Sequence, residues 1–489
     1  MLSSLLKFAL GACAGPWLSM AGAQALPAPV VAALAQAGVP PDHVAMVVMP
    51  IPGRESVPLK PERRFIWRAD APMSPASVMK VVTTYAALDL LGPDYFWKTR
   101  LYTQGTIRNG TLHGNLLIRG SGDPKLVWDR LTELFDAAHA KGLKAVDGNI
   151  LLDRSVFNLP PHDPAAFDDE PMRPYNVGPD GLLVNFKALT FKFFPTPGSA
   201  RVRVESEPPI AGVRIPATVP AAKGACGDWR AHLQGHFSDP DKVTFAGRYA
   251  RSCGDQEWSV AYVDPNEYAP RVIRALWAGT GGSVSGQVQW APAGSDPADA
   301  APGEPWVTGY SLPLSEIIAD INQYSNNVMA QQVFLTLSDG PGGATFAKSI
   351  RAVDAWWQRT LARYPPPILD NGSGLSRDGR VTAGALAALL RHAAQDPRAA
   401  DAFERSLPIA GVNGTARHLA DRSPRSDAIG RARFKTGTLR DVVSLAGYAW
   451  GLSGQQYVVV GLVNDPNADA ARPALDRLVE WAVDDQGAL

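Results

Sequence analysis

The sequence predicts a mixed α/β fold of three nested parts: a main domain of antiparallel sheet and helices, an inserted α/β domain, and a small all-β domain nested in the insert. Its length of 489 residues corresponds to about three domains. Residues 98–189 and 263–301 alternate between strand and helix patterns, whereas residues 190–262 hold short alternating runs separated by proline and glycine. Residues 24–97 and 302–489 then form the main domain.

Residues 1–23 have the pattern of a secretory signal peptide, with Lys7 before a mostly apolar run and Ala21-Gly22-Ala23 as a cleavage site. A cut after Ala25 is the alternative. Leu10–Cys13 looks like a lipoprotein signal, but the apolar run before it is too short for one. Elsewhere no segment reaches the ~18 apolar residues of a membrane-spanning helix, so we expect the mature chain to be soluble.

The composition is that of an ordinary globular protein, with 46% apolar and 19% charged residues. The 47 basic and 47 acidic residues balance, and no basic stripe indicates a nucleic-acid partner. After cleavage of the signal, two cysteines remain, Cys226 and Cys253. An even pair in a secreted chain predicts a disulfide, and two unpaired buried thiols are the alternative.

The first part of the main domain contains a strand and a buried helix. Val44–Met49 is an uninterrupted apolar run of strand length. Ser74 can cap a helix and Pro75 suits its first position, whereas Gly92 ends it. The stretch between them is apolar nearly all round, which is typical of a helix at the centre of a domain. Ser77 would then lie about one turn into this helix.

The insert begins as an α/β unit. Leu112–Ile118 and Gly148–Leu152 have strand patterns, and an amphipathic helix ending at Gly142 lies between them. Arg271–Trp277 followed by Val284–Trp290 returns to helix and strand. The all-β residues therefore interrupt this unit.

The C-terminal part completes the main domain. After a linker rich in proline, alanine and glycine, the chain is mostly helical until about Asp421. A strand then leads into Lys435, two more strands form a hairpin turned at Ser453-Gly454, and a helix closes the chain. This order predicts an antiparallel sheet covered by the closing helix and by a helical subdomain.

Ser77 and Lys80 form a Ser-x-x-Lys pair on one face of the predicted helix. A serine hydroxyl is a poor nucleophile unless a base lies beside it, and lysine is a base only where burial or nearby positive charge lowers its pKa. The helix N-terminus would also favour a developing anion. The pair alone is a weak signal, because Ser4-Leu-Leu-Lys7 matches it too, and a surface serine near a lysine is the ordinary alternative.

Two further motifs follow in order along the chain. Ser325-Asn326-Asn327 supplies a hydroxyl and an amide for proton transfer, although such clusters more often form turns. Lys435-Thr436-Gly437 supplies a cation on a strand. The three motifs together are those of enzymes that transfer acyl groups through serine. Because the span from Ser77 to Ser325 is more than twice that from Ser325 to Lys435, whole domains must be inserted within one site.

Other chemistries are poorly represented, and the sequence predicts no cofactor and no metal. The chain contains neither a Gly-x-Ser-x-Gly nor a His-Glu-x-x-His motif. His232 and His236 have the spacing of helical metal ligands, but Gly235 intervenes and no third ligand is near in sequence. Gly120-Ser121-Gly122 marks a turn, because it does not continue into a phosphate-binding pattern.

Three segments, Arg119–Pro124, Asp370–Arg377 and Ser406–Thr415, together with the motifs, resemble the class C low-molecular-mass penicillin-binding proteins, the D-alanyl-D-alanine carboxypeptidase/endopeptidase family. The resemblance covers essentially the whole mature chain, the long insert included. It implies a penicillin-recognising serine transpeptidase/β-lactamase-like catalytic domain, with an inserted α/β domain and a nested β domain. One departure is Asn326, where many relatives have Asp.

By this resemblance the chain is a periplasmic serine D,D-peptidase that acts on peptidoglycan stem peptides and that β-lactam antibiotics inhibit covalently. Ser77 would form the acyl-enzyme and Lys80 would take its proton. Ser325 and Asn327 would complete the proton relay and hold the substrate amide. Two alternatives stay open, a β-lactamase and a catalytically silent penicillin-binding or wall-scaffolding module, and a homo-oligomer is open as well.

Substrate binding would fall to the third motif and to the insert. The resemblance implies that the terminal carboxylate of D-alanine binds at Lys435 and Thr436, beside Gly437. Backbone N–H groups of Ser77 and Thr438 would form the oxyanion hole.

The inserted region also contains an acidic cluster, Asp168-Asp169-Glu170. Stem peptides of Gram-negative-type walls carry a diamino acid with a cationic amine. The hypothesis is that Asp169 and Glu170 bind this amine, and the alternative is a solvated acidic loop.

Overall fold

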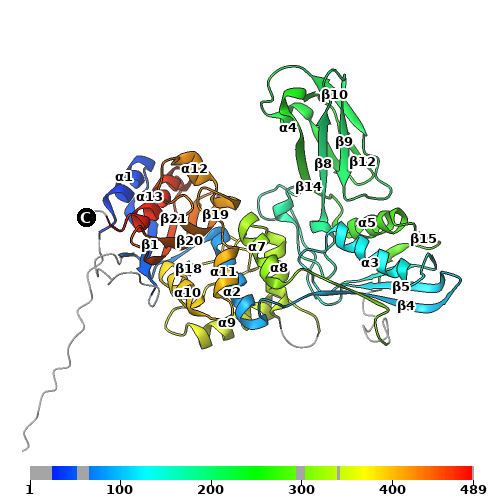
Figure 1. Cartoon of the computed structure of the whole chain (residues 1–489), viewed down its shortest axis with the longest axis horizontal. Coiled ribbons are helices and arrows are strands. Elements are labelled where there is room, and N and C mark those ends of the chain that lie inside the picture. Colours follow the sequence, from blue (N-terminus) through cyan, green and yellow to red (C-terminus); the bar gives the residue numbers. More distant parts are fainter. Residues whose placement is uncertain (1–24, 52–64, 293–302, 339–341, 487–489) are drawn as a thin grey trace, which may run out of the picture.

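The computed structural model describes residues 25–51, 65–292, 303–338 and 342–486. The predicted signal peptide and its cleavage site at Ala23 lie outside the described residues. Figure 1 shows the main domain on the left, the insert on the right, and the β module projecting upward from the insert. The mixed α/β class predicted from the sequence is confirmed.

The main domain is built on a five-stranded antiparallel sheet in the order β19-β20-β21-β1-β2. Its N-terminal strand β1 pairs with the C-terminal strand β21, so the first and last parts of the chain form one sheet. The predicted hairpin is β20 and β21, joined near Gly454. The strands are β1 (Val44–Pro50), β2 (Phe65–Trp67), β19 (Ala432–Leu439), β20 (Val442–Trp450) and β21 (Gln456–Asn464).

Helices cover both faces of this sheet, because alternate residues of β1 enter two different cores. Val44, Met46 and Val48 pack with α1 (Ala28–Ala37) and the closing helix α13 (Arg472–Val483). Ala45, Val47 and Met49 pack with the helical subdomain on the other face. That subdomain contains α2 (Met79–Leu91), α7 (Leu314–Tyr324), α8 (Asn327–Thr336), α9 (Phe346–Thr360), α10 (Ala383–Gln395) and α11 (Ala400–Ser406), and the short α12 (His418–Arg422) follows.

The central helix α2 differs from its prediction at the N-terminus. Ser74 does not cap it; instead, its backbone N–H and C=O bond the side chain of Asn464 at 2.8 and 2.9 Å. A 3₁₀ turn, Ala76–Val78, comes first, and the α-helix begins only at Met79. These hydrogen bonds tie the entering chain to β21, and Ser77 lies in the turn before the helix and not one turn into it.

The insert contains a seven-stranded sheet in which the long hairpin β4–β5 is central, covered by α3 (Trp128–Ala140) and α5 (Pro265–Gly279). The predicted domain limit at residue 302 falls too early for this sheet, because β17 (Val307–Tyr310) pairs with β4 (Lys98–Arg108). The other predicted boundaries stay predictions. The remaining strands are β5 (Thr111–Arg119), β6 (Ala145–Asp147), β7 (Ile150–Asp153), β15 (Ser283–Val284) and β16 (Val288–Trp290).

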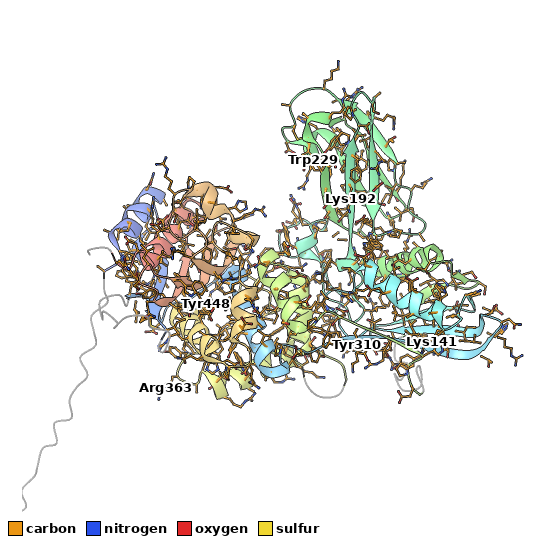
Figure 2. The ribbon with its side chains drawn as sticks, viewed as in Figure 1. Lys141, Lys192, Trp229, Tyr310, Arg363 and Tyr448 are labelled. Carbon is orange, nitrogen blue, oxygen red and sulfur yellow. A yellow bond between two sulfur atoms is a disulfide. The ribbon has the colours of Figure 1, made fainter. Side chains whose placement is uncertain are left out.

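The β module has a five-stranded sheet in the order β13-β10-β9-β8-β14 and a separate hairpin, β11–β12. Aromatic side chains pack in its core, where the Trp229 ring contacts the rings of Phe193 and Trp258 edge-on. Figure 2 shows Trp229 within this module. Cys226 and Cys253 form the predicted disulfide, with Cα atoms 4.7 Å apart. The elements are β8 (Ala188–Pro195), β9 (Arg201–Glu207), β10 (Thr218–Ala222), α4 (Trp229–Leu233), β11 (Gly235–Asp239), β12 (Lys242–Phe245), β13 (Tyr249–Ala250) and β14 (Gln256–Ala261).

Two short strands, β3 (Pro72–Met73) and β18 (Val381–Thr382), pair at the edge of the main domain. Over the described ranges, no helix is both long and apolar enough to cross a membrane.

Candidate active site

Ser77 lies in the 3₁₀ turn before α2, where three segments approach closely. Ala76 has the left-handed φ of 48°, which L-residues adopt only when their surroundings force it. A Cβ at Gly374 would lie 1.9 Å from the Ala76 carbonyl oxygen, and a Cβ at Gly437 would lie 2.6 Å from the Pro75 carbonyl oxygen. The two glycines therefore let a loop and strand β19 pass against the backbone that carries the nucleophile.

Lys80 is fully buried, and its Nζ lies 3.0 Å from Ser77 Oγ. The same nitrogen donates to Asn327 Oδ1 at 2.7 Å and to the Ser373 carbonyl oxygen at 2.6 Å. Burial, and secondarily the positive charge of Lys435, lowers the pKa of Lys80 well below its ordinary value. A lysine so placed can accept the proton of the Ser77 hydroxyl.

The second motif joins two helices. Ser325 has the left-handed φ of 58° and ends α7, and the Asn326 side chain caps α8 by accepting from the Met329 N–H at 3.1 Å. Asn and Asp are equally good N-cap residues, so an Asp at position 326 could cap α8 in the same way. The turn directs Ser325 Oγ to Lys435 Nζ, 2.9 Å away, and places Asn327 at the start of α8, beside Lys80.

Lys435 lies on β19 and is fully buried. Its ammonium donates to Ser325 Oγ and, at 2.7 Å, to the Thr436 carbonyl oxygen, and burial lowers its pKa to about 7. Thr436 Oγ1 lies 2.7 Å from Thr415 Oγ1. Thr438 is exposed at the cavity, and its Oγ1 accepts from Arg472 at 3.2 Å. Lys435 is therefore buried behind Ser325 and does not line the cavity, whereas Thr438 does.

A cavity of about 390 Å³ opens above Ser77. Motif residues form one side of it, and the insert supplies Phe167, Asp168 and Tyr175 on the other. The guanidinium of Arg377 stacks over the Phe167 ring, 4.6 Å from its centroid, so the main domain and the insert meet at the cavity. The remaining lining residues are Ser325, Asn327, Leu375, Thr438, Leu439 and Arg440.

Of the acidic cluster, the carboxylate that lines the cavity is Asp168. It accepts from Tyr175 Oη at 2.8 Å, Asn176 Nδ2 at 2.7 Å and the Glu170 N–H at 3.2 Å. Burial alone would raise the pKa of Asp168, but the hydrogen bonds from Asn176, Tyr175 and Glu170 together lower it. Asp169 and Glu170 are exposed outside the lining, and Glu170 forms an ion pair with Arg173 at 3.2 Å.

The insert also contacts the catalytic residues directly. Asn327 Nδ2 donates to the Tyr175 carbonyl oxygen at 3.0 Å. One amide side chain thus links the insert to Lys80 by its two ends, nitrogen to Tyr175 and oxygen to Lys80. The orientation of Asn327 is therefore fixed from both sides.

Sequence reasoning missed the contacts of Ser373, Thr415 and Tyr175 with the motif residues, and it missed Arg440, which lines the cavity. Ser373 and Thr415 stand inside two of the family-like segments, which was a usable signal. The motif residues Ser77, Lys80, Ser325, Asn327 and Lys435, in contrast, are all brought together as the sequence placed them. Among the described residues, no three His, Cys, Asp or Glu side chains gather as a metal site would need.

Comparison with known proteins identifies the family. The family model of D-Ala-D-Ala carboxypeptidase 3 (S13) matches residues 63–484. The chain is 26% identical over 416 residues to D-alanyl-D-alanine carboxypeptidase DacB of Haemophilus influenzae, covering 80% of each protein. It is 28% identical over 428 residues to the D-alanyl-D-alanine carboxypeptidase of an Actinomadura species, covering 83% of this chain and 77% of that one.

The fold agrees with a solved relative. The crystal structure of penicillin-binding protein 4 (DacB) from Haemophilus influenzae matches with a TM-score of 0.68 at 23% identity, covering 89% of this chain and 94% of that one. At this identity the match shows the fold, and the family model supplies the chemistry. The chain belongs to the D-Ala-D-Ala carboxypeptidase 3 (S13) family and is a serine-type D-Ala-D-Ala carboxypeptidase.

Proposed function

We propose that the chain removes the terminal D-alanine from peptidoglycan stem peptides through an acyl-enzyme on Ser77. The observation that carries this mechanism is the 3.0 Å contact between Lys80 Nζ and Ser77 Oγ, made by a lysine whose pKa burial lowers. Neutral Lys80 takes the hydroxyl proton as Ser77 attacks the carbonyl of the penultimate D-alanine. The developing oxyanion is held by the backbone N–H groups of Ser77 and Thr438.

Ser325 is the proton donor for the departing amine in this mechanism. Its hydroxyl lies between Lys435 Nζ, 2.9 Å away, and the cavity that it lines. As the tetrahedral intermediate collapses, the peptide C–N bond breaks and the amine of D-alanine takes a proton by way of Ser325. Water then hydrolyses the acyl ester, with Lys80 again as the base.

The carboxylate of the leaving D-alanine binds over the end of β19 in this proposal. Thr438 supplies a hydroxyl at the surface, and the buried Lys435 supplies positive potential from below. Thr436, fixed by Thr415, and Gly437 keep the strand close to the nucleophile. The same arrangement accepts the carboxylate of a penicillin, so we expect β-lactams to acylate Ser77.

The charged residues that line the cavity suit a substrate whose side chain is itself charged. Asp168 presents a carboxylate to the cavity, and Arg377 and Arg440 lie on the same lining. A diamino acid whose free end holds both an ammonium and a carboxylate complements this mixture of charges. Asp168 therefore takes the place of Asp169 and Glu170 in the amine-binding hypothesis, and cross-linked peptides that present such an end are proposed substrates as well.

The test is release of D-alanine from a peptide that ends in a diamino acid followed by D-Ala-D-Ala. Wild-type protein is expected to release D-alanine, and mass spectrometry is expected to find one penicilloyl group on Ser77 after incubation with penicillin. Absence of D-alanine release from a folded, penicillin-labelled protein would favour the silent penicillin-binding module. Rapid, sustained hydrolysis of penicillin would instead favour the β-lactamase.

The location and assembly of the protein are part of the same proposal. A periplasmic location of the mature chain is supported by the predicted signal peptide and by the proposed peptidoglycan substrates. Cell fractionation with N-terminal sequencing of the mature protein tests this and locates the cut. Light scattering of the purified protein tests the homo-oligomer.

A further inference from the structure

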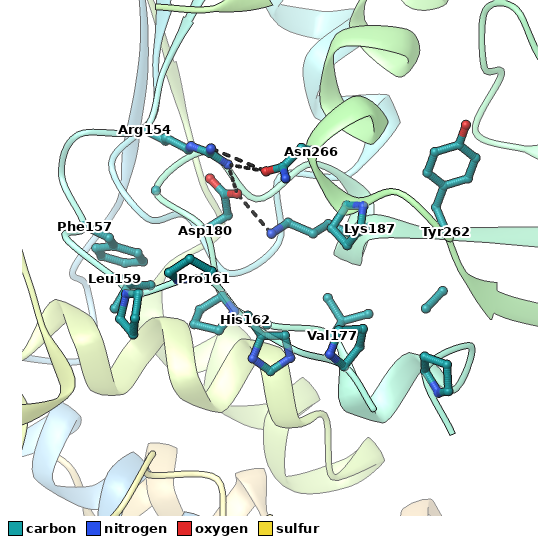
Figure 3. Close-up of a pocket in the computed structure, with 18 of the residues that line it drawn as sticks. Arg154, Phe157, Leu159, Pro161, His162, Val177, Asp180, Lys187, Tyr262 and Asn266 are labelled. Atoms are coloured by element: carbon teal, nitrogen blue, oxygen red, sulfur yellow. Dashed lines mark hydrogen bonds and ion pairs between the residues drawn. The ribbon is translucent and has the colours of Figure 1, made fainter. Parts of the chain in front are cut away.

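A second cavity, of about 440 Å³, lies in the insert at the junction with the β module. We call it the Asp180 pocket, after the carboxylate at its centre. Figure 3 shows Arg154, Asp180, Lys187 and Asn266 joined on one side, with Phe157, Leu159 and Val177 on the other. Much of the wall is proline: Pro160, Pro161, Pro164, Pro171, Pro179 and Pro265. The pocket thus has a charged end and a rigid apolar side.

The charged end has one positive charge in excess. Asp180 Oδ2 faces Lys187 Nζ at 3.0 Å and Arg154 Nη1 at 3.2 Å, while Oδ1 accepts from the Leu182 N–H at 3.1 Å. Asp180 is the acidic residue among those that line the cavity, so one carboxylate faces two cations. The two cations differ in access, because the side chain of Lys187 is 11% exposed and that of Arg154 is 42% exposed.

Both cations are held in place. Lys187 ends a run of three left-handed residues, with φ of 40° at Asn185, 56° at Phe186 and 50° at Lys187. Three consecutive L-residues in this region cost free energy that a simple loop avoids. The run is fixed by the Lys187 N–H, which donates to the Val184 carbonyl oxygen at 2.9 Å. Its effect is to direct a lysine into the cavity.

Arg154 is held by an aromatic ring and an amide. Its guanidinium lies 4.1 Å from the centroid of the Trp290 ring, and two of its nitrogens lie 3.4 Å from Asn266 Oδ1. A stacked guanidinium keeps its planar edge in one direction, which suits recognition of a planar anion. Side chains fixed in this way lose little entropy when a ligand binds.

We propose that the Asp180 pocket binds a carboxylate that ends a short apolar chain. A monoanion balances the single excess charge, whereas a phosphate dianion would leave a negative charge inside the cavity. The proline side chains offer an apolar surface against which the apolar chain of the ligand can pack without hydrogen bonds. The C-terminus of a peptide presents this chemistry, whereas a free amino acid carries an ammonium beside its carboxylate and has no net charge.

The pocket and the active site share structural elements. The backbone of Asp180 exchanges two hydrogen bonds of 2.9 Å with the side chain of Gln332. Gln332 lies on α8, the helix that begins at Asn327. His162, on the pocket wall, donates to the Asn176 carbonyl oxygen at 2.7 Å, and Asn176 in turn donates to Asp168. A ligand in the pocket is therefore bound against the loop that carries Asp168.

The test measures binding on protein whose active site is already occupied. Protein fully acylated by penicillin, as verified by mass, is titrated with N-acetyl-D-alanyl-D-alanine in a calorimeter. The same titration uses the C-terminal amide of that dipeptide and free D-alanine. The acid is expected to bind at least tenfold more tightly than the amide. Penicillin acylation is verified by mass before the titration. A failure of the proposed function therefore shows as missing acylation, whereas a failure of the pocket proposal shows as missing binding to acylated protein.

Variants assign the binding to the pocket. Arg154→Gln is expected to weaken binding of the acid at least tenfold, and Arg154→Lys is expected to recover part of the affinity; in both, Lys187 still pairs with Asp180. Lys192→Gln, on β8 outside the pocket, is the matched control and should bind as wild type does. The acetylated dipeptide is expected to bind more tightly than free D-alanine, whose ammonium adds a positive charge at the cationic end of the pocket. Equal or tighter binding of free D-alanine would overturn the assignment to a peptide end. Equal binding of acid and amide, no measurable binding, or no effect of Arg154→Gln would overturn the proposal.

Discussion

Lys80 and Lys187 are both buried lysines, but their surroundings differ in one respect. Lys187 faces a carboxylate, Asp180, at 3.0 Å. Lys80 bonds a hydroxyl, an amide oxygen and a carbonyl oxygen, and Lys435 bonds a hydroxyl and a carbonyl oxygen. Within the described residues, neither Lys80 nor Lys435 has a carboxylate at ion-pair distance. The pocket in the insert thus pairs its lysine with an anion, whereas the active site leaves its two lysines with neutral partners.

Lysine can serve either as a base or as a cation that binds anions, depending on its neighbours. A neighbouring anion favours the protonated form of lysine, whereas burial among neutral groups favours the free amine. The lowered pKa of Lys80 follows from burial and from the second cation, Lys435. The proposed base and the proposed anion site therefore differ in the partners that surround their lysines. Five predictions test this difference between the two sites.

Removing the nucleophile should abolish the chemistry and leave the lysines in place. Ser77→Ala is expected to lose all covalent penicillin labelling and D-alanine release, because no other group in the cavity combines a hydroxyl with Lys80 at 3.0 Å. The measurement is mass spectrometry after incubation with penicillin. Ser206→Ala, in the β module, is the control. A penicilloyl adduct on Ser77→Ala would mean that a different residue is acylated.

Replacing the base by a permanent cation should be nearly as damaging. Lys80→Arg is expected to lower the acylation rate by roughly 100- to 10,000-fold, since guanidinium does not release its proton near neutral pH. Stopped-flow kinetics with a chromogenic β-lactam measures the rate. Lys192→Arg, an exchange of the same kind outside the site, should keep the wild-type rate. If Lys80→Arg keeps most of its rate, Lys80 is not the base.

The pH dependence should report both lysines, with opposite signs. As pH rises, Lys80 loses its proton and becomes a base, so kcat/KM rises. As pH passes about 7, Lys435 loses its charge and its attraction for the substrate carboxylate, so kcat/KM falls. Lys435→Arg keeps the positive charge at higher pH. The pH at which kcat/KM falls on the alkaline side should therefore move upward, even if the maximal kcat/KM changes. Measurement of kcat/KM from about pH 5 to 10 decides; an unmoved alkaline limb would show that another group causes it.

Removing the charge of Asp168 should lower the activity on peptides and leave the rate of penicillin acylation nearly unchanged. Asp168→Asn is expected to lower kcat/KM about tenfold, or roughly 1.4 kcal/mol, for peptides with a diamino acid. Penicillin acylation should stay within about twofold, because it uses only the motif residues. The double variant Asp169→Asn, Glu170→Gln compares the residues named from sequence, and we expect a smaller effect. A larger effect of the double variant would return the amine site to Asp169 and Glu170.

Reducing the disulfide should leave the lysines of the active site untouched. The loop closed by Cys226 and Cys253 spans 27 residues, for which loop entropy gives at most about 3.5 kcal/mol. We expect reduction to lower the melting temperature of the β module and to leave the acylation rate of folded protein unchanged. Calorimetry with and without reductant measures the first effect, and penicillin labelling the second. Two reactive thiols in the untreated protein would contradict the bond.

The family, the enzyme class and the mixed α/β fold class could all be predicted from the sequence. The residues of the three motifs, which the structure brings together, could be named from it as well. These follow from short-range patterns: Lys80 lies three residues after Ser77, Lys435 stands on a recognisable strand, and the long gap before Ser325 requires an insert. The disulfide followed from the number of cysteines. None of these inferences needs knowledge of which distant residues touch.

Only the tertiary structure decided how the site is completed. Asp168 and not its two neighbours lines the cavity, because the loop turns at Asp169, whose φ is positive, and bonds Tyr175 and Asn176. The Ser373 carbonyl oxygen accepts from Lys80, 293 residues away in the sequence, and the backbone of Ser74 bonds the side chain of Asn464 on β21. A backbone carbonyl carries no sequence signal, and the pairing of distant segments depends on packing energies summed over the whole fold. The fold therefore sets which partners surround each buried lysine: neutral oxygens at Lys80 and the carboxylate of Asp180 at Lys187.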